Sequence, residues 1–403
     1  MWSFFSLEHL FLFLCWLLAA GWLWQGIAGL RGMPGLPDLT GGAAEGLQPL
    51  APCEEPDLTV IVPACNEEKT IAATLRSLLA STGLRLQIIA VNDRSVDLTG
   101  KSMLAVAEEA ESTGSPHTLE VLTIGQLPAG WLGKPHAMAR AAARAKAAWL
   151  LFTDGDVLFE PKALELALRW AQSTQADHLI LVPSLILRTT SERAMLGAMQ
   201  ALAQWTVRIW KVADPRARDF LGVGGFNLVR RSAYDAVGGF EALRLEVLDD
   251  LRLGWKIKRA GFAQQVALGP GLVRIRWIDG AFGVVHLVEK NGFALYRYRV
   301  GLHLLASLAM LVQFLLPLAG IAAGGWTMVA GLVTYLGIGM VYRANGRMSA
   351  VGAWHAILFA PMGMVISYGF LRSMVLALVR NGVDWRGTRY PLGELRRHAG
   401  LGW

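Results

Sequence analysis

The sequence WLLFTDGD at residues 149–156 joins a short apolar run to an acidic turn. Apolar runs of this length that end in turn residues are typical of buried strands. The carboxylates of Asp154 and Asp156 could hold a divalent cation, because Mg²⁺ and Mn²⁺ prefer oxygen ligands. An ordinary Asp-Gly turn explains the same residues equally well. This stretch therefore predicts a strand that ends either in a plain turn or in a metal site.

Three further apolar runs precede this stretch and alternate with segments of helical spacing. The predicted strands are LTVIVP at 58–63, LQIIAV at 86–91 and residues 119–124, and the predicted helices span 70–79, 98–110 and 137–148. This alternation predicts a parallel α/β sheet, in which ligands bind beyond the carboxyl ends of the strands. Asn66, Asp93 and the acidic turn follow such ends, so we expect them to lie together. Asn66 and Asp93 also have a structural interpretation as helix caps, and Asn66 is placed to cap the helix that follows it.

The second half of the chain adds a glycine-rich stretch and a pair of acidic residues. Gly224 and Gly225 lie in FLGVGGFNLV at 220–229 and either let a substrate approach the backbone or form a tight turn. Asp249 and Asp250 begin a predicted helix that runs to about residue 260. They either favour the helix dipole or supply a general base, since a neighbouring like charge raises the pKa of a carboxyl group.

The composition indicates a membrane protein. Of 403 residues, 54% are hydrophobic and 17% are charged, against about 45–50% and about 25% in soluble proteins. This excludes a disordered chain and disfavours a purely soluble enzyme. The net charge of +7 suits an anionic membrane surface or a phosphorylated substrate better than a nucleic acid. Cys15, Cys53 and Cys65 are too few for a disulfide framework or a zinc site, so we expect free thiols.

Three long stretches lack Asp, Glu, Lys and Arg. Residues 10–30 form an apolar run long enough to span a bilayer, and we expect a retained anchor rather than a cleaved signal peptide because residues 1–9 contain no Lys or Arg. Residues 302–342, with Pro317 and the pair Gly324–Gly325, predict a helix hairpin. Residues 348–371 either form a third span or are re-entrant or interfacial.

These runs define the predicted organisation. We expect an N-terminal transmembrane anchor at 1–31, a linker at 32–56, a catalytic domain at 57–300, membrane helices at 301–379 and a basic tail at 380–403. Arg343 and Arg347 end the hairpin and favour a cytoplasmic position there. The anchor and hairpin would then leave the large domain on the cytoplasmic side. The basic tail also favours the cytoplasm, which a full third span would not allow.

Six motifs follow one another in the order and spacing of a known family. They are VPACNEE at 62–68, VNDRSVDLTG at 91–100, GWLGKPHA at 130–137, LLFTDGD at 150–156, GGFNLVRRSAYDAVGGF at 224–240 and LDDLRLGWKIKRAGF at 248–262. With them the chain resembles the membrane-anchored family 2 glycosyltransferases of the GT-A fold. GWLGKP at 130–135 and WRGTRY at 385–390 resemble the hopene-associated and carotenoid-type branch in particular.

The resemblance assigns roles to individual residues. It implies a nucleoside pocket at Pro63, Asn66, Glu67 and Asp93, a phosphate contact at Lys134, a Mg²⁺ or Mn²⁺ site at Asp154 and Asp156, and a catalytic base at Asp250. Asp249 stands where the family usually has Glu. Arg276 and Trp277 match part of an acceptor motif of processive members, but Val273 replaces its Gln, which argues against a polysaccharide synthase. Arg276 and Trp277, like Gly224 and Gly225, remain candidate acceptor or pyrophosphate contacts.

The resemblance implies an inverting hexosyltransferase of a multi-pass bacterial inner membrane, with its catalytic domain in the cytoplasm. The expected donor is a nucleotide sugar, in particular a UDP-sugar, and the expected acceptor is a lipid hydroxyl. A polyprenyl-phosphate acceptor, a processive polysaccharide synthase and a non-catalytic nucleotide-binding membrane protein are the alternatives. No nucleic-acid or protein partner is predicted.

Overall fold

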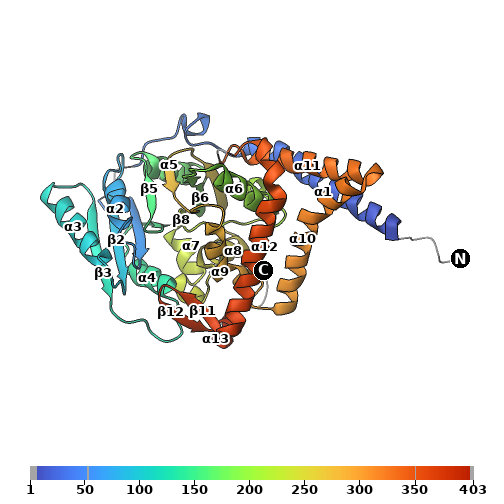
Figure 1. The fold of residues 1–403 in the computed structure, drawn as a ribbon. Coiled ribbons are helices and arrows are strands. Elements are labelled where there is room, and N and C mark those ends of the chain that lie inside the picture. The colour runs from blue at the N-terminus through green and yellow to red at the C-terminus, as the bar shows by residue number, and fades with distance from the viewer. Residues whose placement is uncertain (1–6, 52–53, 350, 400–403) are drawn as a thin grey trace. The chain divides into compact units, whose positions relative to one another are not determined.

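The computed structural model describes residues 7–51, 54–349 and 351–399 (Figure 1). They form two compact units. The helical unit comprises the chain up to Gly35, Leu187–Trp210 and Ile278–Val383, and the sheet unit comprises Leu36–Ile186, Lys211–Trp277 and the chain from Asp384 onward. Cys15 and Cys65 are buried free thiols, as expected, whereas Cys53 lies outside the described residues.

A seven-stranded sheet forms the centre of the sheet unit, in the order β3-β2-β1-β4-β8-β6-β9. The strands are β1 (Leu58–Ala64), β2 (Leu86–Asp93), β3 (Thr118–Ile124), β4 (Trp149–Phe152), β6 (His178–Val182), β8 (Asn227–Arg230) and β9 (Gln264–Leu268). β8 runs antiparallel to both β4 and β6, and the other neighbours are parallel. The predicted α/β fold with a mostly parallel sheet is confirmed.

Smaller elements complete this unit. Its helices are α2 (Ile71–Leu79), α3 (Thr99–Ser112), α4 (Gly133–Ala142), α5 (Ala163–Ser173), α7 (Arg231–Ala236), α8 (Asp249–Arg259) and α13 (Leu392–His398). A second sheet has the order β5 (Val157–Phe159), β10 (Val273–Ile275) and β7 (Ser184–Leu185), and a hairpin joins β11 (Gly382–Trp385) to β12 (Thr388–Pro391). The 3₁₀ turns of this unit are η2 (Gly42–Ala44) and η4 (Phe240–Leu243), whereas η1 (Met33–Gly35) and η5 (Ala353–Leu358) belong to the helical unit and η3 (Ile209–Lys211) lies at the boundary between the two.

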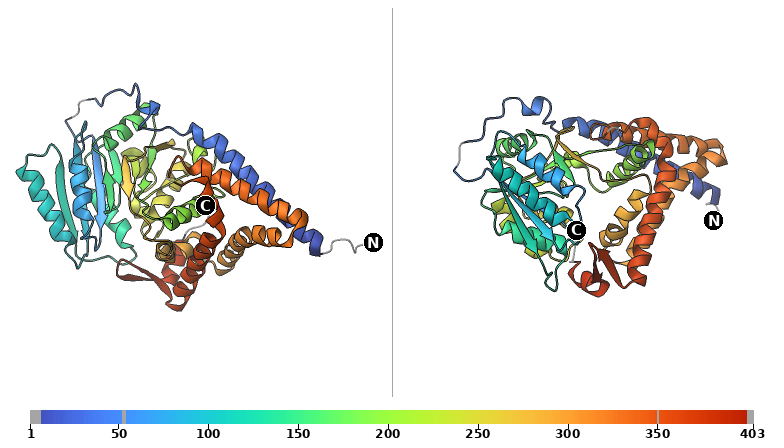
Figure 2. Two further views of the ribbon diagram at one scale, coloured as in Figure 1. Left: turned by 45° about the horizontal axis from the view of Figure 1, so that its top comes forward. Right: turned by 60° about the vertical axis from the view of Figure 1, so that its left-hand side comes forward.

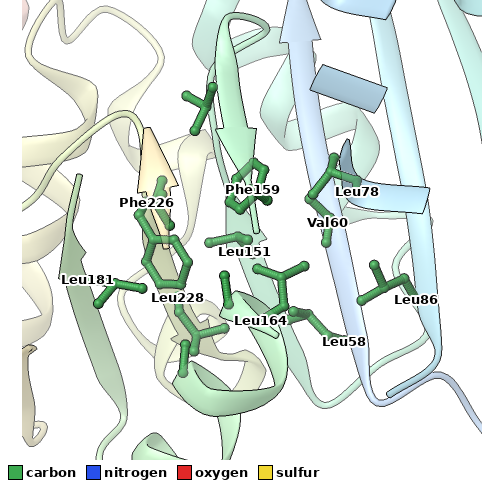
Figure 3. Close-up of a cluster of buried hydrophobic side chains, with 14 of the residues drawn as sticks. Leu58, Val60, Leu78, Leu86, Leu151, Phe159, Leu164, Leu181, Phe226 and Leu228 are labelled. Atoms are coloured by element: carbon green, nitrogen blue, oxygen red, sulfur yellow. The ribbon is translucent and has the colours of Figure 1, made fainter. Parts of the chain in front are cut away.

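Apolar side chains cover both faces of the central sheet, which explains the uninterrupted apolar runs. Val60 and Val62 belong to the core on one face, and Ile61 between them belongs to the core on the other. Figure 3 shows Val60, Leu151 and Leu228 of three strands pointing into the first core. Because this packing fixes the register of β1 and β4, the residues that follow these strands emerge at one edge of the sheet.

Two local predictions need correction. The helix expected at 137–148 is α4, which runs from Gly133 to Ala142, so both predicted ends are wrong; Pro135 is tolerated because it lies in the first turn. The expected cap at Asn66 is also wrong, since Thr70 precedes α2 as its N-cap residue. Asn66 has φ +57° and instead accepts a hydrogen bond from the Val96 backbone N–H at 2.9 Å, so it holds the loop after β2.

Among its described residues, the helical unit contains four helical stretches long and apolar enough to cross a membrane. They are Leu7–Gly35, Val300–Ala323, Gly325–Asn345 and Ala353–Val379. Its helices are α1 (Leu7–Gly32), α6 (Thr190–Ala203), α9 (Gly283–Leu295), α10 (Val300–Ala323), α11 (Gly325–Asn345) and α12 (Phe359–Val379). α1 and α11 lie side by side (Figure 2), and a Cβ on Gly337 would stand 2.6 Å from the Trp22 backbone. Such small residues let membrane helices pack closely.

Candidate functional site

The acidic turn predicted after β4 lies at the carboxyl end of the parallel strands. The Thr153 hydroxyl donates to the Gly225 carbonyl at 2.9 Å, which ties the turn to the glycine-rich segment. A Cβ on Gly155 would lie 2.1 Å from Glu67 Oε2. Glu67 from the β1 end therefore packs directly against this glycine, and a larger residue there would displace its carboxylate.

Lys134, the second residue of α4, provides a buried cation for this turn. Its Nζ lies 2.6 Å from Asp154 Oδ1 and 3.9 Å from Asp249 Oδ2. Burial alone would lower the pKa of Lys134, but the carboxylates of Asp154, Asp249 and Asp250 outweigh burial and hold this pKa above its usual range. Lys134 is therefore charged at any physiological pH.

Asp250 joins the same cluster from the first turn of α8. Its Oδ1 accepts a hydrogen bond from the Leu251 N–H at 2.7 Å, and its carboxylate also accepts from the Gly224 N–H. Burial raises the pKa of Asp250 above its usual range, although Lys134 and these two N–H groups oppose the rise. The carboxyl group is thus fixed in position while its basicity is increased.

Glycine 224 marks the point where three charged side chains converge. A Cβ there would lie 2.7 Å from Asp154 Oδ2, 3.3 Å from Asp250 Oδ2 and 3.3 Å from Lys134 Nζ. Nearby, a Cβ on Gly222 would lie 1.9 Å from the Asp250 carbonyl oxygen. The glycine-rich segment therefore lies against the start of α8 with no room for side chains.

Five carboxylates form what we call the acidic cluster, namely Glu67, Asp154, Asp156, Asp249 and Asp250. Burial and then the charge of Asp154 raise the pKa of Asp156 to about 6. Burial raises the pKa of Glu67 to about 7, with Arg386 acting against it and the two aspartates of the turn adding to it. Burial is the main cause of both raised pKa values, and repulsion between the carboxylates adds to it, so a bound cation would favour the ionised form of both groups.

The residues of the turn fit a divalent metal that arrives with a phosphorylated ligand. Among the described residues, no three His, Cys, Asp or Glu side chains are grouped to hold a metal by themselves. Asp154 and Asp156 supply two carboxylates, and buried Glu67 Oε2 has no hydrogen-bond partner in the described part of the chain. Mg²⁺ usually takes one or two protein carboxylates and completes its coordination with water and phosphates.

The predicted nucleoside residues lie at the ends of β1 and β2. Pro63 is buried within β1, and Asp93 is fully buried at the end of β2, where Arg94 pairs with it through two hydrogen bonds of 2.7 and 3.1 Å. A Cβ on Gly133 would lie 2.4 Å from Asp93 Oδ2, so α4 begins against this ion pair. Asn66, by contrast, is exposed in its loop.

Arg276 and Trp277 directly follow β10, the central strand of the second sheet, and Gly225 lies near the same strand. A Cβ on Gly225 would stand 3.2 Å from Pro183 and 4.0 Å from the Ile275 side chain, which precedes Arg276. Arg276 donates to the Ile186 carbonyl at 3.2 Å, and 42% of Trp277 is exposed. These contacts do not bring Arg276 or Trp277 to the acidic cluster.

Arg386 is the residue of the site that sequence reasoning missed. Its Nη2 lies 3.3 Å from Glu67 Oε1, although 319 positions separate the two residues. Two more hairpin residues reach the same strand ends: Thr388 accepts from Arg94 at 3.0 Å, and the Tyr390 hydroxyl accepts from the Gly133 N–H at 3.2 Å. The motif WRGTRY was visible in the sequence, but nothing in it revealed where the hairpin lies.

Comparison with known proteins places this site in a family. The model of the family described as "Glycosyltransferase like family 2" matches residues 56–276. The chain is 23% identical to the 4,4'-diaponeurosporenoate glycosyltransferase of Staphylococcus aureus strain USA300 over 348 residues, which cover 84% of this chain and 89% of the relative.

Solved structures were also found, at lower similarity. A Pyrobaculum calidifontis mannosyltransferase, solved with GDP-Man and Mn²⁺, has a TM-score of 0.49 at 16% identity, covering 91% of this chain and 99% of its own. The 1–349 fragment of S. aureus TarS with UDP has a TM-score of 0.37 at 13% identity, covering 81% and 92%. The family assignment rests on the sequence match. The chain belongs to glycosyltransferase family 2, and it is a glycosyltransferase with a GT-A-type α/β domain and apolar helices.

Proposed function

We propose that this protein transfers a sugar from a nucleotide sugar, in particular a UDP-sugar, to the hydroxyl group of a lipid, with inversion at the anomeric carbon. The observation that carries this proposal is the convergence of Lys134, Asp154 and Asp250 at the side-chain-free Gly224. This places a cation, a metal-ligand candidate and a basic carboxylate around one small space.

Asp250 is the proposed catalytic base. Its raised pKa makes it a better proton acceptor than an ordinary aspartate, and its two backbone hydrogen bonds fix the direction of the carboxylate. In a single displacement, the acceptor oxygen would lose its proton to Asp250 while it attacks the anomeric carbon, and the nucleoside diphosphate would leave. One base is sufficient, and no covalent intermediate with the protein is required.

The remaining members of the cluster would bind the donor. We assign the nucleoside to Pro63, Asn66, Glu67 and Asp93, and the diphosphate to the side of the site where Lys134 provides a permanent positive charge. Asp154 and Asp156 would hold a divalent metal, Mg²⁺ or Mn²⁺, which when bound neutralises charge on the leaving diphosphate. Asp249, 3.9 Å from Lys134, would help to hold the ammonium in place.

The lipid acceptor is supported by two independent features. The helical unit provides apolar helices long enough to reach acyl chains or polyenes in a bilayer. In addition, the S. aureus relatives are named for a carotenoid, 4,4'-diaponeurosporenoate. We place the catalytic domain on the cytoplasmic side, because Arg343 and Arg347 end α11 and its following turn, and because nucleotide sugars are cytoplasmic metabolites.

The decisive experiment compares Asp250→Asn with Asp235→Asn in the full chain purified in detergent. Asp235 is an exposed residue of α7 that pairs with Arg231 at 3.6 Å, so its substitution is a matched control. Transfer from a panel of UDP- and GDP-sugars would be measured with Mg²⁺ or Mn²⁺ and a bacterial lipid extract. We expect Asp250→Asn to lower kcat by about 10² to 10⁴, the usual contribution of a general base, and Asp235→Asn to leave it unchanged.

Three other results of this experiment would favour a different function. If Asp250→Asn transfers sugar as fast as the wild type, the base assignment is wrong, and an acceptor that is already ionised, such as a polyprenyl phosphate, is favoured. A ladder of products of increasing length would identify a processive polymerase. UDP binding without turnover of any donor in the presence of lipid would contradict the proposed reaction.

A further inference from the structure

The turn between β11 and β12 has an unusual composition. It consists of two residues, Arg386 with φ +49° and Gly387 with φ +75°. A two-residue hairpin turn with both φ values positive favours Asn-Gly or Asp-Gly, because the left-handed region is unfavourable for longer side chains. Arginine at the first position is thus a strained choice. Strain of this kind is found at functional sites, where the surrounding structure compensates for it.

The guanidinium of Arg386 lies inside the site. Its Nη2 lies 3.3 Å from Glu67 Oε1, and only 14% of its side chain is exposed. Its charge also lowers the pKa of Asp156, which places it within electrostatic reach of the acidic turn. Its Nη1 is buried and has no hydrogen-bond partner among the described residues. A buried N–H donor without a partner is costly, so this nitrogen is available for an acceptor that comes from outside the chain.

The hairpin does not need Arg386 to stay attached to the rest of the sheet unit. Thr388 and Tyr390 already connect the hairpin to Arg94 and Gly133, and Arg389 pairs with Asp384 through bonds of 2.7 and 3.1 Å within the hairpin itself. A buried ion pair such as Arg386–Glu67 is also weak as a stabilising device, because desolvation of both charges opposes their attraction. A purely structural role therefore explains neither the residue type nor the free nitrogen.

We propose that Arg386 binds the diphosphate of the nucleotide-sugar donor through Nη1, while Nη2 stays on Glu67, an inference that rests on the proposed function above. The guanidinium group suits this task because its planar fork matches phosphate oxygens and stays charged. Lys134 is already engaged by Asp154 at 2.6 Å, so a further cation beside Lys134 and the proposed metal would help to balance a diphosphate next to five carboxylates. The segment that follows the last apolar helix thus completes the donor site.

The test measures binding rather than turnover. UDP binding to the full chain in detergent with Mg²⁺ would be followed by calorimetry, and binding of uridine, which has no phosphate, by saturation-transfer NMR. GDP and guanosine form the second probe pair. We expect Arg386→Gln to weaken diphosphate binding at least tenfold and to leave nucleoside binding unchanged. Arg386→Lys should bind the diphosphate with an affinity between those of the wild type and Arg386→Gln, because lysine keeps the charge and loses the planar fork.

Arg389→Gln is the matched control, since it removes the same group from the same hairpin at an exposed position. It should bind every probe like the wild type. Equal losses of UDP and uridine binding in Arg386→Gln would show a structural role and overturn the inference. Unchanged UDP binding in Arg386→Gln would overturn it as well, while leaving the proposed function intact. If the wild type binds neither UDP nor GDP, the donor assignment of the proposed function fails, and this inference fails with it.

Discussion

At the scale of single residues, the site depends on places where a side chain is missing. Asp154, Asp250 and Lys134 approach one another only because Gly224 places no atom between them. Gly155 likewise leaves room for the Glu67 carboxylate. Neither glycine has a positive φ, so these positions need glycine for the space it leaves and not for its backbone conformation. The charged groups can lie close together because these two positions carry no side chain.

This reasoning predicts the effect of Gly224→Ala. The added methyl group would stand 2.7 Å from Asp154 Oδ2, so the carboxylate must turn away and the space for a metal-bound diphosphate becomes smaller. We expect at least a tenfold loss of kcat/KM for the donor, at a thermal stability close to that of the wild type. Gly125→Ala is the control, because a Cβ there meets no atom within 4 Å. Equal activity of the two variants would show that the space at Gly224 is not used.

At the scale of elements, the position of Asp250 depends on how α8 meets the glycine-rich segment. A Cβ on Gly254, in the second turn of α8, would lie 2.0 Å from the Leu221 carbonyl oxygen. The Gln264 side chain of β9 holds Leu221 from the other side, bonding both its N–H and its carbonyl at 3.0 Å. The helix therefore packs directly against the backbone of this segment, and this packing determines the position of Asp250.

Gly254→Ala should accordingly reverse the usual effect of alanine in a helix. Replacing an interior glycine by alanine commonly stabilises a helix by about 1 kcal/mol. Here the methyl group collides with backbone, and overpacking of this kind costs about 1–3 kcal/mol. We expect a lower unfolding temperature in detergent and reduced transfer for Gly254→Ala. Gly393→Ala in α13, where a Cβ meets nothing within 4 Å, should be neutral or slightly stabilising. A stabilised Gly254→Ala would contradict this packing argument.

At the scale of the whole molecule, the tail constrains the membrane topology. Residues from Asp384 onward contact the donor end of the sheet unit through Arg386 and Tyr390, so they lie on the same side of the membrane as that unit. We therefore expect an even number of crossings between Trp277 and Asp384, although three apolar stretches occupy this interval. On this expectation, one of these stretches does not cross completely.

The contacts of α12 favour it as the stretch that does not cross. Arg372 and Arg380 both pair with Glu289 of α9 at 3.3 Å, and the Ser373 hydroxyl donates to the Glu289 carbonyl at 2.7 Å. Charged groups at this density are expensive in the centre of a bilayer. We therefore expect α10 and α11 to cross the membrane and α12 to lie at the interface or to re-enter.

This topology can be tested by labelling single cysteines with a membrane-impermeant maleimide in vesicles of known orientation. The native cysteines would first be replaced by serine, and Glu111→Cys, Gly393→Cys and Trp326→Cys would then be introduced one at a time. Glu111 and Trp326 are both exposed, the latter at the turn between α10 and α11. The cysteines at 111 and 393 should react from the same side and the one at 326 from the opposite side. Labelling of 393 together with 326 would contradict the expected topology.

The sequence by itself determined the family, the mostly parallel sheet and the acidic turn after β4. These properties are local, because apolar runs such as LTVIVP specify buried strands and Asp-Gly specifies a turn wherever they occur. It also determined three uncharged runs, of which 302–342 corresponds to the two stretches Val300–Ala323 and Gly325–Asn345, and 348–371 to the stretch Ala353–Val379. The cap assigned to Asn66 was wrong because the Asn66 side chain accepts instead from the Val96 backbone N–H, which belongs to the loop after β2.

Only the tertiary structure decided how these residues meet. The pairing of Lys134 with Asp154, the contact of Gly222 with Asp250 and the approach of Arg386 to Glu67 all join residues far apart in the chain. No local pattern encodes such contacts, because they result from the packing of whole elements against the sheet. The sequence therefore named most of the candidate residues, and the fold decided which of them share one charged space.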